Sequence, residues 1–365
     1  MKKPDKSNYI IYALVILIIM FGFVYFFGLS SDKDKEPIIN NIESFGGGLP
    51  GIGGNANAPI RSLDYDVEFK KWRETMKELG PARAYENFKQ TFAYDHFGTQ
   101  HSAAHIFGEV LFDETGIDGL VFCDSTFAFG CFHSFFGKAL YVLGEDVVED
   151  MDKVCVEKYG ELGTGCQHGI GHGLLQYAGY NNLEEALDLC SHTTQKIPIF
   201  GCTSGVFMEY NVPLIDLGKG ETYVTRTREL NENNPYEPCD TLPEKFRDSC
   251  YYEMAQWWDK VFFVDYKKIG ELCDNIPDQE YVSSCYLGIG NVVAPTHNYD
   301  VELTKSKCEL MPNDKAELIC LSGASWSFFA NPDYRNLAPR LCEDLSEEDK
   351  MKCAKEADLT RSFNE

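Results

Sequence analysis

The sequence predicts an all-α protein: a right-handed solenoid of about seven αα-hairpins, each about 35 residues long and cross-linked by one disulfide. Three observations favour this fold class: a cysteine repeat, apolar residues at helical spacing, and a turn sequence that recurs with the cysteines. The cysteines fall into seven ordered pairs, which are Cys123 with Cys131, Cys155 with Cys166, Cys190 with Cys202, Cys239 with Cys250, Cys273 with Cys285, Cys308 with Cys320, and Cys342 with Cys353.

The cysteine spacing predicts where the disulfides lie. Second cysteines recur about 35 residues apart, which is long enough for one helix, a turn and a second helix. The two cysteines of a pair are 8 to 12 residues apart, whereas zinc ribbons use Cys-x-x-Cys ligand pairs. An even number of cysteines in an exported chain indicates disulfides, so each pair is predicted to link the two helices of one hairpin.

Local sequence supports the hairpins. Apolar residues at helical spacing predict a first helix that ends near Cys273, and a second helix that begins at Pro277 and runs through Cys285. Proline suits the first turn of a helix because that position has no intrahelical partner for an N–H. The same Cys-x-x-aliphatic-Pro sequence begins at Cys239 and at Cys308, which indicates that the turn repeats with the hairpin.

A small residue stands three positions after most of the second cysteines. These small residues are Ser134, Gly169, Gly205, Gly288 and Gly323. A missing side chain at a helix crossing lets two backbones approach closely. We therefore expect successive second helices to pack tightly against one another at this level.

The step from Cys202 to Cys250 is longer than the others, and the extra residues fall within 211–238. The sequence there breaks the helical pattern, so we expect an insertion that forms a loop or a small β-hairpin. No second change of composition divides residues 63–358, which predicts one elongated repeat domain. Residues 359–365 are expected to be a frayed tail.

The N-terminus predicts a single-pass membrane anchor. Residues 9–29 are uncharged and mostly apolar, which is long enough for a helix to cross a bilayer. Lysines in residues 1–8 favour a cytoplasmic N-terminus and an extracytoplasmic C-terminal domain at the cell membrane. A cleaved signal peptide is the alternative. Residues 30–62 are rich in glycine and small polar residues, which predicts a flexible linker.

The charge of the chain bears on its partners. The formal net charge is −24 at pH 7. An acidic surface repels nucleic acid and anionic lipid headgroups, so neither is an expected partner. High net charge also keeps a protein soluble, which is the simpler interpretation.

Cysteine-linked helical hairpins at this period resemble the cysteine-rich tetratricopeptide-like repeat proteins of exported bacterial origin. The resemblance covers the chain from Cys123 to Cys353 and rests on the repeat period and the disulfide placement. It implies a curved α-solenoid that binds a protein or peptide on its concave face. It does not imply catalysis.

The histidines suggest a second kind of function. His133 and His168 both stand two positions after a second cysteine, and aligning the preceding segment with them places His105 at the same position. We call this set of positions the histidine column. Three successive second helices would then each present an imidazole at one level, and stacked helices lie only about 8 to 10 Å apart.

Further polar residues lie one helical turn from the column, at i, i+4 spacing on the same helix face. The predicted metal ligands are His101, His105, Glu109, His133, His168 and His172. Met208 and Glu209 stand at the edge of this group and can close it. Later repeats carry other residues at the column position, so the site is confined to the N-terminal third: Ser204, Tyr252, Leu287 and Ser322.

Imidazole and carboxylate ligands suit zinc, copper or iron, and the ligand types alone do not choose among them. An ion with an open position would activate water, with Glu109 or Glu209 as candidate general base. A filled coordination sphere would make the site structural or a store. The sequence leaves open whether the protein is an enzyme.

Two function classes therefore remain: a membrane-anchored extracytoplasmic metalloprotein, and a disulfide-linked scaffold without metal, in which the histidines line a groove or pack in the core. Haem is disfavoured because no Cys-x-x-Cys-His motif occurs. His96, His192 and His297 stand outside the column and are interpreted as surface or packing residues.

Overall fold

The computed structural model describes residues 59, 61–127, 129–160, 164–211, 228–331 and 334–353. The chain divides into two compact units, residues 1–45 and 46–365, and all described residues belong to the second. The described residues form helices, turns and bends, without a β-strand, which confirms the all-α class. The expected membrane helix at 9–29, the segment 1–8, most of the linker and the tail 359–365 lie outside the described residues. Within the described ranges, no helix is both long and apolar enough to span a bilayer.

The helices alternate along the chain. Two helices form an N-terminal hairpin: α2 (Tyr65–Leu79) and α3 (Pro81–Phe92). The first helices of the later hairpins are α6 (Val148–Tyr159), α8 (Leu183–Leu189), α11 (Tyr266–Asp274) and α13 (Val301–Cys308). The helices that pack on one another in succession are α4 (Phe97–Thr115), α5 (Gly130–Leu143), α7 (Thr164–Ala178), α9 (Cys202–Asn211), α10 (Glu244–Val261), α12 (Val282–Thr296) and α14 (Asp314–Ala330). Short 3-10 helices connect several of them, among them η2 (Gly116–Phe122), η4 (Cys190–His192), η5 (Pro198–Phe200), η7 (Gln279–Tyr281) and η8 (Arg335–Cys342).

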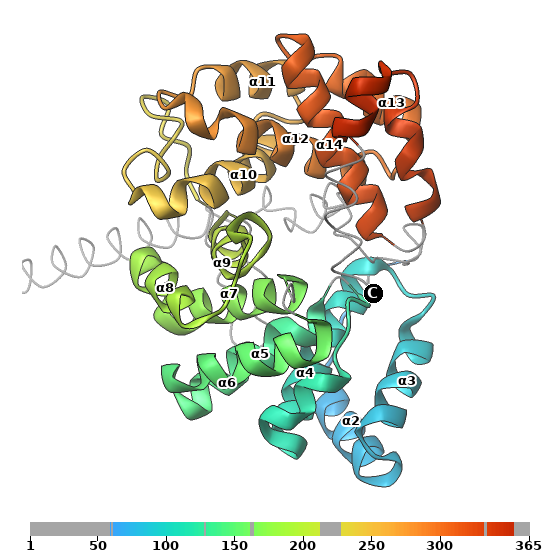
Figure 1. Ribbon diagram of the computed structural model, residues 1–365. Helices are drawn as coiled ribbons and strands as arrows, with labels where there is room; N and C mark the ends of the chain where they lie inside the picture. Colours follow the sequence, from blue (N-terminus) through green and yellow to red (C-terminus); the bar gives the residue numbers. More distant parts are fainter. Residues whose placement is uncertain are drawn as a thin grey trace, which may run out of the picture. The chain divides into compact units, whose positions relative to one another are not determined.

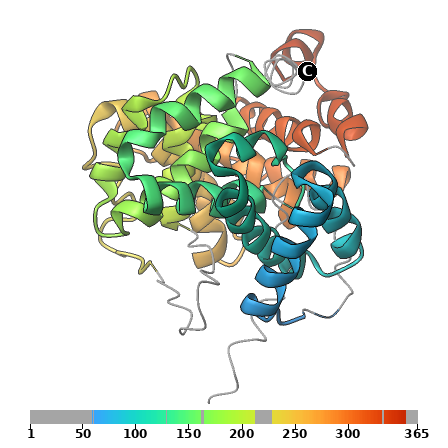
Figure 2. The same cartoon turned by 90° about the horizontal axis from the view of Figure 1, so that it is seen from below.

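An N-terminal hairpin without cysteines precedes the repeats. The Asp64 side chain accepts a hydrogen bond from the Val67 N–H and caps α2, and Gly80 with a φ of +76° separates α2 from α3. Trp72 of α2 packs edge-on against Phe88 of α3 and Phe107 of α4. Helices α2, α4, α5 and α7 therefore lie side by side in chain order, as both views show (Figure 1 and Figure 2).

All seven predicted cysteine pairs form disulfides. The second cysteine of every pair lies in a helix, but only three first cysteines lie in α-helices: Cys155, Cys273 and Cys308. The other four lie in or directly after 3-10 helices, or in a turn. The links are therefore as predicted, while the expectation of two α-helices in each hairpin is too regular. Seven disulfides indicate an oxidising environment outside the cytoplasm.

The helix crossings confirm the role of the small residues. A Cβ added to Gly205 of α9 would lie 1.9 Å from the carbonyl oxygen of His168 on α7. A Cβ added to Gly323 of α14 would lie 2.1 Å from the carbonyl oxygen of Leu287 on α12. Both approaches are too close for any side chain, so glycine sets the distance between successive second helices.

One aromatic contact joins hairpins that are not neighbours in the chain. Phe200, in η5, stacks on Trp326 of α14 with ring centroids 4.6 Å apart, and it also meets Tyr252 of α10 edge-on. This packing is additional to the contacts between successive helices. Stacked aromatic rings contribute about 0.5–1.5 kcal/mol beyond their buried area.

One expected boundary differs from the structure. Helix α12 begins at Val282 rather than at Pro277, because the turn after Cys273 continues into η7. In the insertion, residues 212–227 lie outside the described residues, and residues 228–238 form turns without a strand. The described part of the insertion therefore matches the predicted loop.

Candidate metal centre

The structure brings the five predicted histidines into one continuous group. They come from three helices: His101 and His105 from α4, His133 from α5, and His168 and His172 from α7. The His133 ring lies 5.3 Å from the His101 ring, 5.5 Å from the His105 ring and 4.3 Å from the His172 ring, between centroids. The predicted proximity of His105 and His133 is therefore confirmed, whereas the α7 ring beside His133 is that of His172.

A trio of imidazoles has the geometry of a metal site. His101, His105 and His133 each offer a nitrogen, and these three atoms lie within 4.8 Å of one another. The Nε2 atoms of His101 and His105 are 3.0 Å apart. Two nitrogens bound to one zinc ion at tetrahedral angles would be about 3.3 Å apart. The pair is thus spaced almost as two ligands of one ion would be.

A backbone carbonyl orients the first imidazole of the trio. The Nδ1 of His101 lies 2.8 Å from the carbonyl oxygen of Phe127, which makes Nδ1 the N–H donor. The Nε2 of a neutral His101 then carries a lone pair. A metal-binding histidine commonly has its second ring nitrogen held in this way, because the hydrogen bond selects the tautomer and fixes the ring.

His133 is the most constrained member of the trio. Its side chain is 2% exposed, and its Nδ1 has no hydrogen-bond partner among the described residues. Leaving a buried polar atom unpaired costs about 1–3 kcal/mol. The neighbouring imidazoles of His101, His105 and His172 surround this ring, and an ion bound at Nδ1 would satisfy the one nitrogen that the described residues leave unpaired.

The second histidine pair has a sulfur neighbour. The Nε2 atoms of His168 and His172 are 3.1 Å apart, and the Sδ of Met208 lies 3.3 Å from the Nε2 of His168. Nδ1 of His172 is 2.9 Å from Oε2 of Glu209, and both of these side chains are fully buried. The carboxylate therefore orients His172 as the Phe127 carbonyl orients His101.

The two predicted carboxylates lie in different environments. Glu109 accepts a hydrogen bond at 2.7 Å from the hydroxyl of Tyr65, which belongs to α2. Glu209 accepts from the hydroxyl of Tyr180 and from the Gln176 amide, in addition to its contact with His172. Glu209 is therefore a candidate base that contacts a predicted ligand, His172, directly.

Burial controls the protonation of the histidines. It lowers the pKa of His101 and lowers the pKa values of His105, His133 and His168 well below the ordinary range. Repulsion from neighbouring imidazoles lowers the pKa values of these last three further. Neutral imidazole is the form that binds a metal, so the burial that disfavours protonation favours coordination.

The remaining histidines lie outside the group, as expected. Nδ1 of His96 accepts a hydrogen bond from the Gly98 N–H and caps α4. His192 is half-exposed and lies 3.4 Å from Glu149. His297 packs edge-on near Tyr266.

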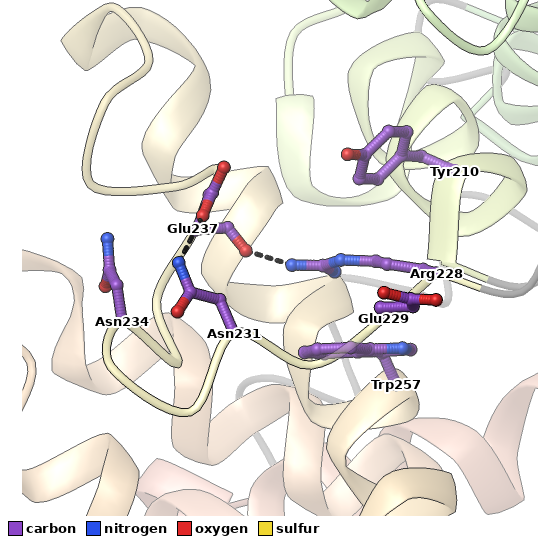
Figure 3. A pocket seen from close by; sticks show the side chains of 7 residues that line it. All are labelled: Tyr210, Arg228, Glu229, Asn231, Asn234, Glu237 and Trp257. Carbon is purple, nitrogen blue, oxygen red and sulfur yellow. Dashed lines mark hydrogen bonds between the residues drawn. The ribbon is translucent and has the colours of Figure 1, made fainter.

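A separate cavity lies beside the insertion, with a volume of about 180 Å³ (Figure 3). Its lining residues are Tyr210, Arg228, Glu229, Asn231, Asn234, Glu237 and Trp257. The Arg228 guanidinium lies 3.7 Å from the centroid of Trp257 and donates to Asn211 and to the Glu237 carbonyl. Arginine thus anchors the end of the insertion, and we interpret this cavity as structural.

The chain was compared with known proteins, and it matches no family model, no curated protein and no solved structure. The resemblance to tetratricopeptide-like repeats stays a prediction.

Several hydrogen-bond partners of the histidines and glutamates could not be predicted from the sequence. The Phe127 carbonyl, Tyr65 and Tyr180 have no periodic signal, because their positions depend on turns and on packing between helices. One signal was present for Gln176, which follows His172 by four residues on the same helix face. Its amide oxygen lies next to Gly137, the glycine that stands four residues after His133.

Proposed function

We propose that this protein is a membrane-anchored extracytoplasmic metal-binding protein whose His101, His105 and His133 together hold one transition-metal ion. The observation that carries the proposal is the convergence of this trio. Two Nε2 atoms meet at 3.0 Å, a carbonyl orients one of the rings, and the third ring has an unpaired buried nitrogen. Residues 9–29 are the predicted membrane anchor.

Three neutral imidazoles suit zinc or copper, and they leave one position for water or for a small ligand. When bound, such an ion would act as a Lewis acid and lower the pKa of its water. His101 is partly exposed, whereas His105 and His133 are buried.

The proposed function is metal binding, without a defined reaction. A hydrolytic mechanism needs a general base beside the metal-bound water. Glu109 is engaged by Tyr65, and Glu209 is engaged by His172 and Tyr180. We therefore give Glu209 a positioning role and assign no reaction to the site.

The rest of the chain presents this site outside the cell. We propose that the packed second helices form a right-handed αα solenoid of about seven hairpins. The disulfides that hold it persist in an oxidising environment. The net charge of −24 attracts cations and repels nucleic acid. A protein or peptide partner on the concave face belongs to the alternative function, a scaffold without metal.

Elemental analysis of the full-length chain tests the proposal. The protein is purified in detergent without chelators or nickel resin, alongside His133→Ala and the matched control His192→Ala. We expect about one zinc or copper ion per chain in the wild type and in the control, and loss of the ion in His133→Ala. No ion in any of the three after reconstitution with zinc, copper and iron would overturn the proposal and favour the scaffold.

A further inference from the structure

The histidine pair on α7 differs from the trio in one respect: a thioether contacts it. His168 Nε2 is 3.1 Å from His172 Nε2 and 3.3 Å from Met208 Sδ. These two edges are slightly shorter than the spacing between neighbouring ligands of one ion, since metal–nitrogen bonds of about 2.0 Å and metal–sulfur bonds of about 2.3 Å place donors about 3.3–3.6 Å apart.

We propose that His168, His172 and Met208 form a second metal site that is selective for cuprous copper. It goes beyond the proposed function, because it uses a different donor set from the trio.

The donor chemistry selects the ion. Thioether sulfur is a soft, uncharged ligand that favours Cu(I), whereas nitrogen and oxygen donors suit the divalent ions. Two nitrogens and one sulfur suffice for Cu(I), which accepts low coordination numbers. The trio of His101, His105 and His133 contains no sulfur, so the two sites should sort ions by softness.

Charge and burial support a monovalent ion. His172 is fully buried and Met208 is partly buried, so an ion bound there loses most of its hydration. The cost of burying a charge rises steeply with its magnitude, so a monovalent ion costs less to bury here than a divalent one. The Glu209 carboxyl, 2.9 Å from Nδ1 of His172, places one acidic group beside the site.

The register of the helices explains why these residues meet. His172 stands six residues after Cys166 on α7, and Met208 stands six residues after Cys202 on α9. The tight crossing at Gly205 brings the backbone of α9 against the carbonyl of His168. The next helix therefore supplies sulfur at the level where α7 supplies imidazole.

The simpler interpretation is a shared hydrogen bond, in which one N–H of the pair lies between nitrogen and sulfur. Met208→Leu separates the two interpretations because leucine keeps the volume and the apolar contacts but removes the sulfur. A hydrogen-bonded pair loses little by this change. A copper site loses one of its three ligands.

The test is a Cu(I) titration of the full-length chain in detergent under anaerobic conditions, after loading with one equivalent of zinc. A chromogenic Cu(I) chelator serves as competitor, and X-ray absorption at the copper edge reports sulfur ligation. We expect one Cu(I) equivalent with a sulfur ligand in the wild type. In Met208→Leu we expect loss of the sulfur signal and at least about tenfold weaker binding.

Two further variants separate this inference from the proposed function. His105→Ala should lose the zinc but keep Cu(I) with its sulfur ligand, whereas His168→Ala should keep the zinc and lose Cu(I). Equal Cu(I) affinity in wild type and Met208→Leu, or copper ligated by nitrogen alone in the wild type, would overturn the second site and leave the first untouched.

Discussion

The N-terminal and C-terminal halves of the helix array share one backbone arrangement and differ in the side chains that it presents. Gly205 packs on the carbonyl of His168 as closely as Gly323 packs on the carbonyl of Leu287. The residue two positions after the second cysteine is histidine in the first two repeats, His133 and His168, and is not histidine in the later ones. Helix packing is therefore set by cysteine and glycine, and the chemistry is set by one variable position beside them.

The junction between the halves contains an exception. Glu253 occupies the position where the neighbouring repeats have glycine, three residues after Cys250. Its side chain is 3% exposed and accepts a hydrogen bond from the Ser204 hydroxyl at 2.5 Å. A carboxyl group thus fills the crossing between α9 and α10, next to the first column residue that is not histidine.

The largest expected effect tests whether the packing is the same in both halves. Gly205→Ala and Gly323→Ala each force a Cβ into a backbone carbonyl, so each should lower the free energy of unfolding by about 3 kcal/mol. Gly137→Ala is the control, because its Cβ would meet only the movable end of Gln176, and we expect a loss below about 1 kcal/mol. Denaturant unfolding measures all three. A large difference between the first two variants would contradict a common backbone arrangement.

The next effect concerns Glu253. Burial raises the pKa of this carboxyl to about 8, although the Ser204 hydrogen bond lowers it in part. Between pH 4.5 and 8 the unfolded carboxyl ionises while the folded one keeps its proton, so stability falls as the pH rises. In Glu253→Gln this loss disappears, and its unfolding free energy relative to wild type should rise by at least about 2 kcal/mol over that range. Parallel pH profiles of the two proteins would contradict the assignment.

A smaller effect compares one column residue from each half. His133 Nδ1 and the Tyr252 hydroxyl are both buried without a hydrogen-bond partner among the described residues. In metal-free protein, His133→Leu and Tyr252→Phe should each gain about 1 kcal/mol, because each removes an unpaired polar atom. With zinc added, we expect His133→Leu to be less stable than wild type while Tyr252→Phe keeps its gain. Thermal unfolding with and without the ion distinguishes these outcomes, and equal zinc responses would count against the trio.

The smallest effect is expected at Ser322. Its hydroxyl donates to the Leu318 carbonyl on its own helix at 2.9 Å, so it has a partner within α14. Ser322→Ala should therefore change the unfolding free energy by less than about 0.5 kcal/mol. A denaturant titration checks this, and a loss above 1 kcal/mol would mean that the C-terminal column also has a specific polar role.

Much of this protein follows from local sequence. The disulfide pairs and the grouping of the five histidines could be predicted, since cysteine spacing and helical periodicity are properties of short segments. The close helix crossings follow from glycine at fixed positions. The first halves of the hairpins are less regular than predicted, because a disulfide requires two nearby Cβ atoms and tolerates a 3-10 helix or a turn as well as an α-helix.

The sequence by itself determined the cross-links, the all-helical class and which residues could meet. Only the tertiary structure decided which polar side chains meet: Glu209 contacts His172, Tyr65 donates to Glu109, and Met208 contacts His168. The physical reason is that periodicity sets the face of a helix on which a residue lies, while the side-chain conformations and the crossing of neighbouring helices set which atoms come within 3 Å. The spacing of residues along one chain carries no information about these conformations and crossings.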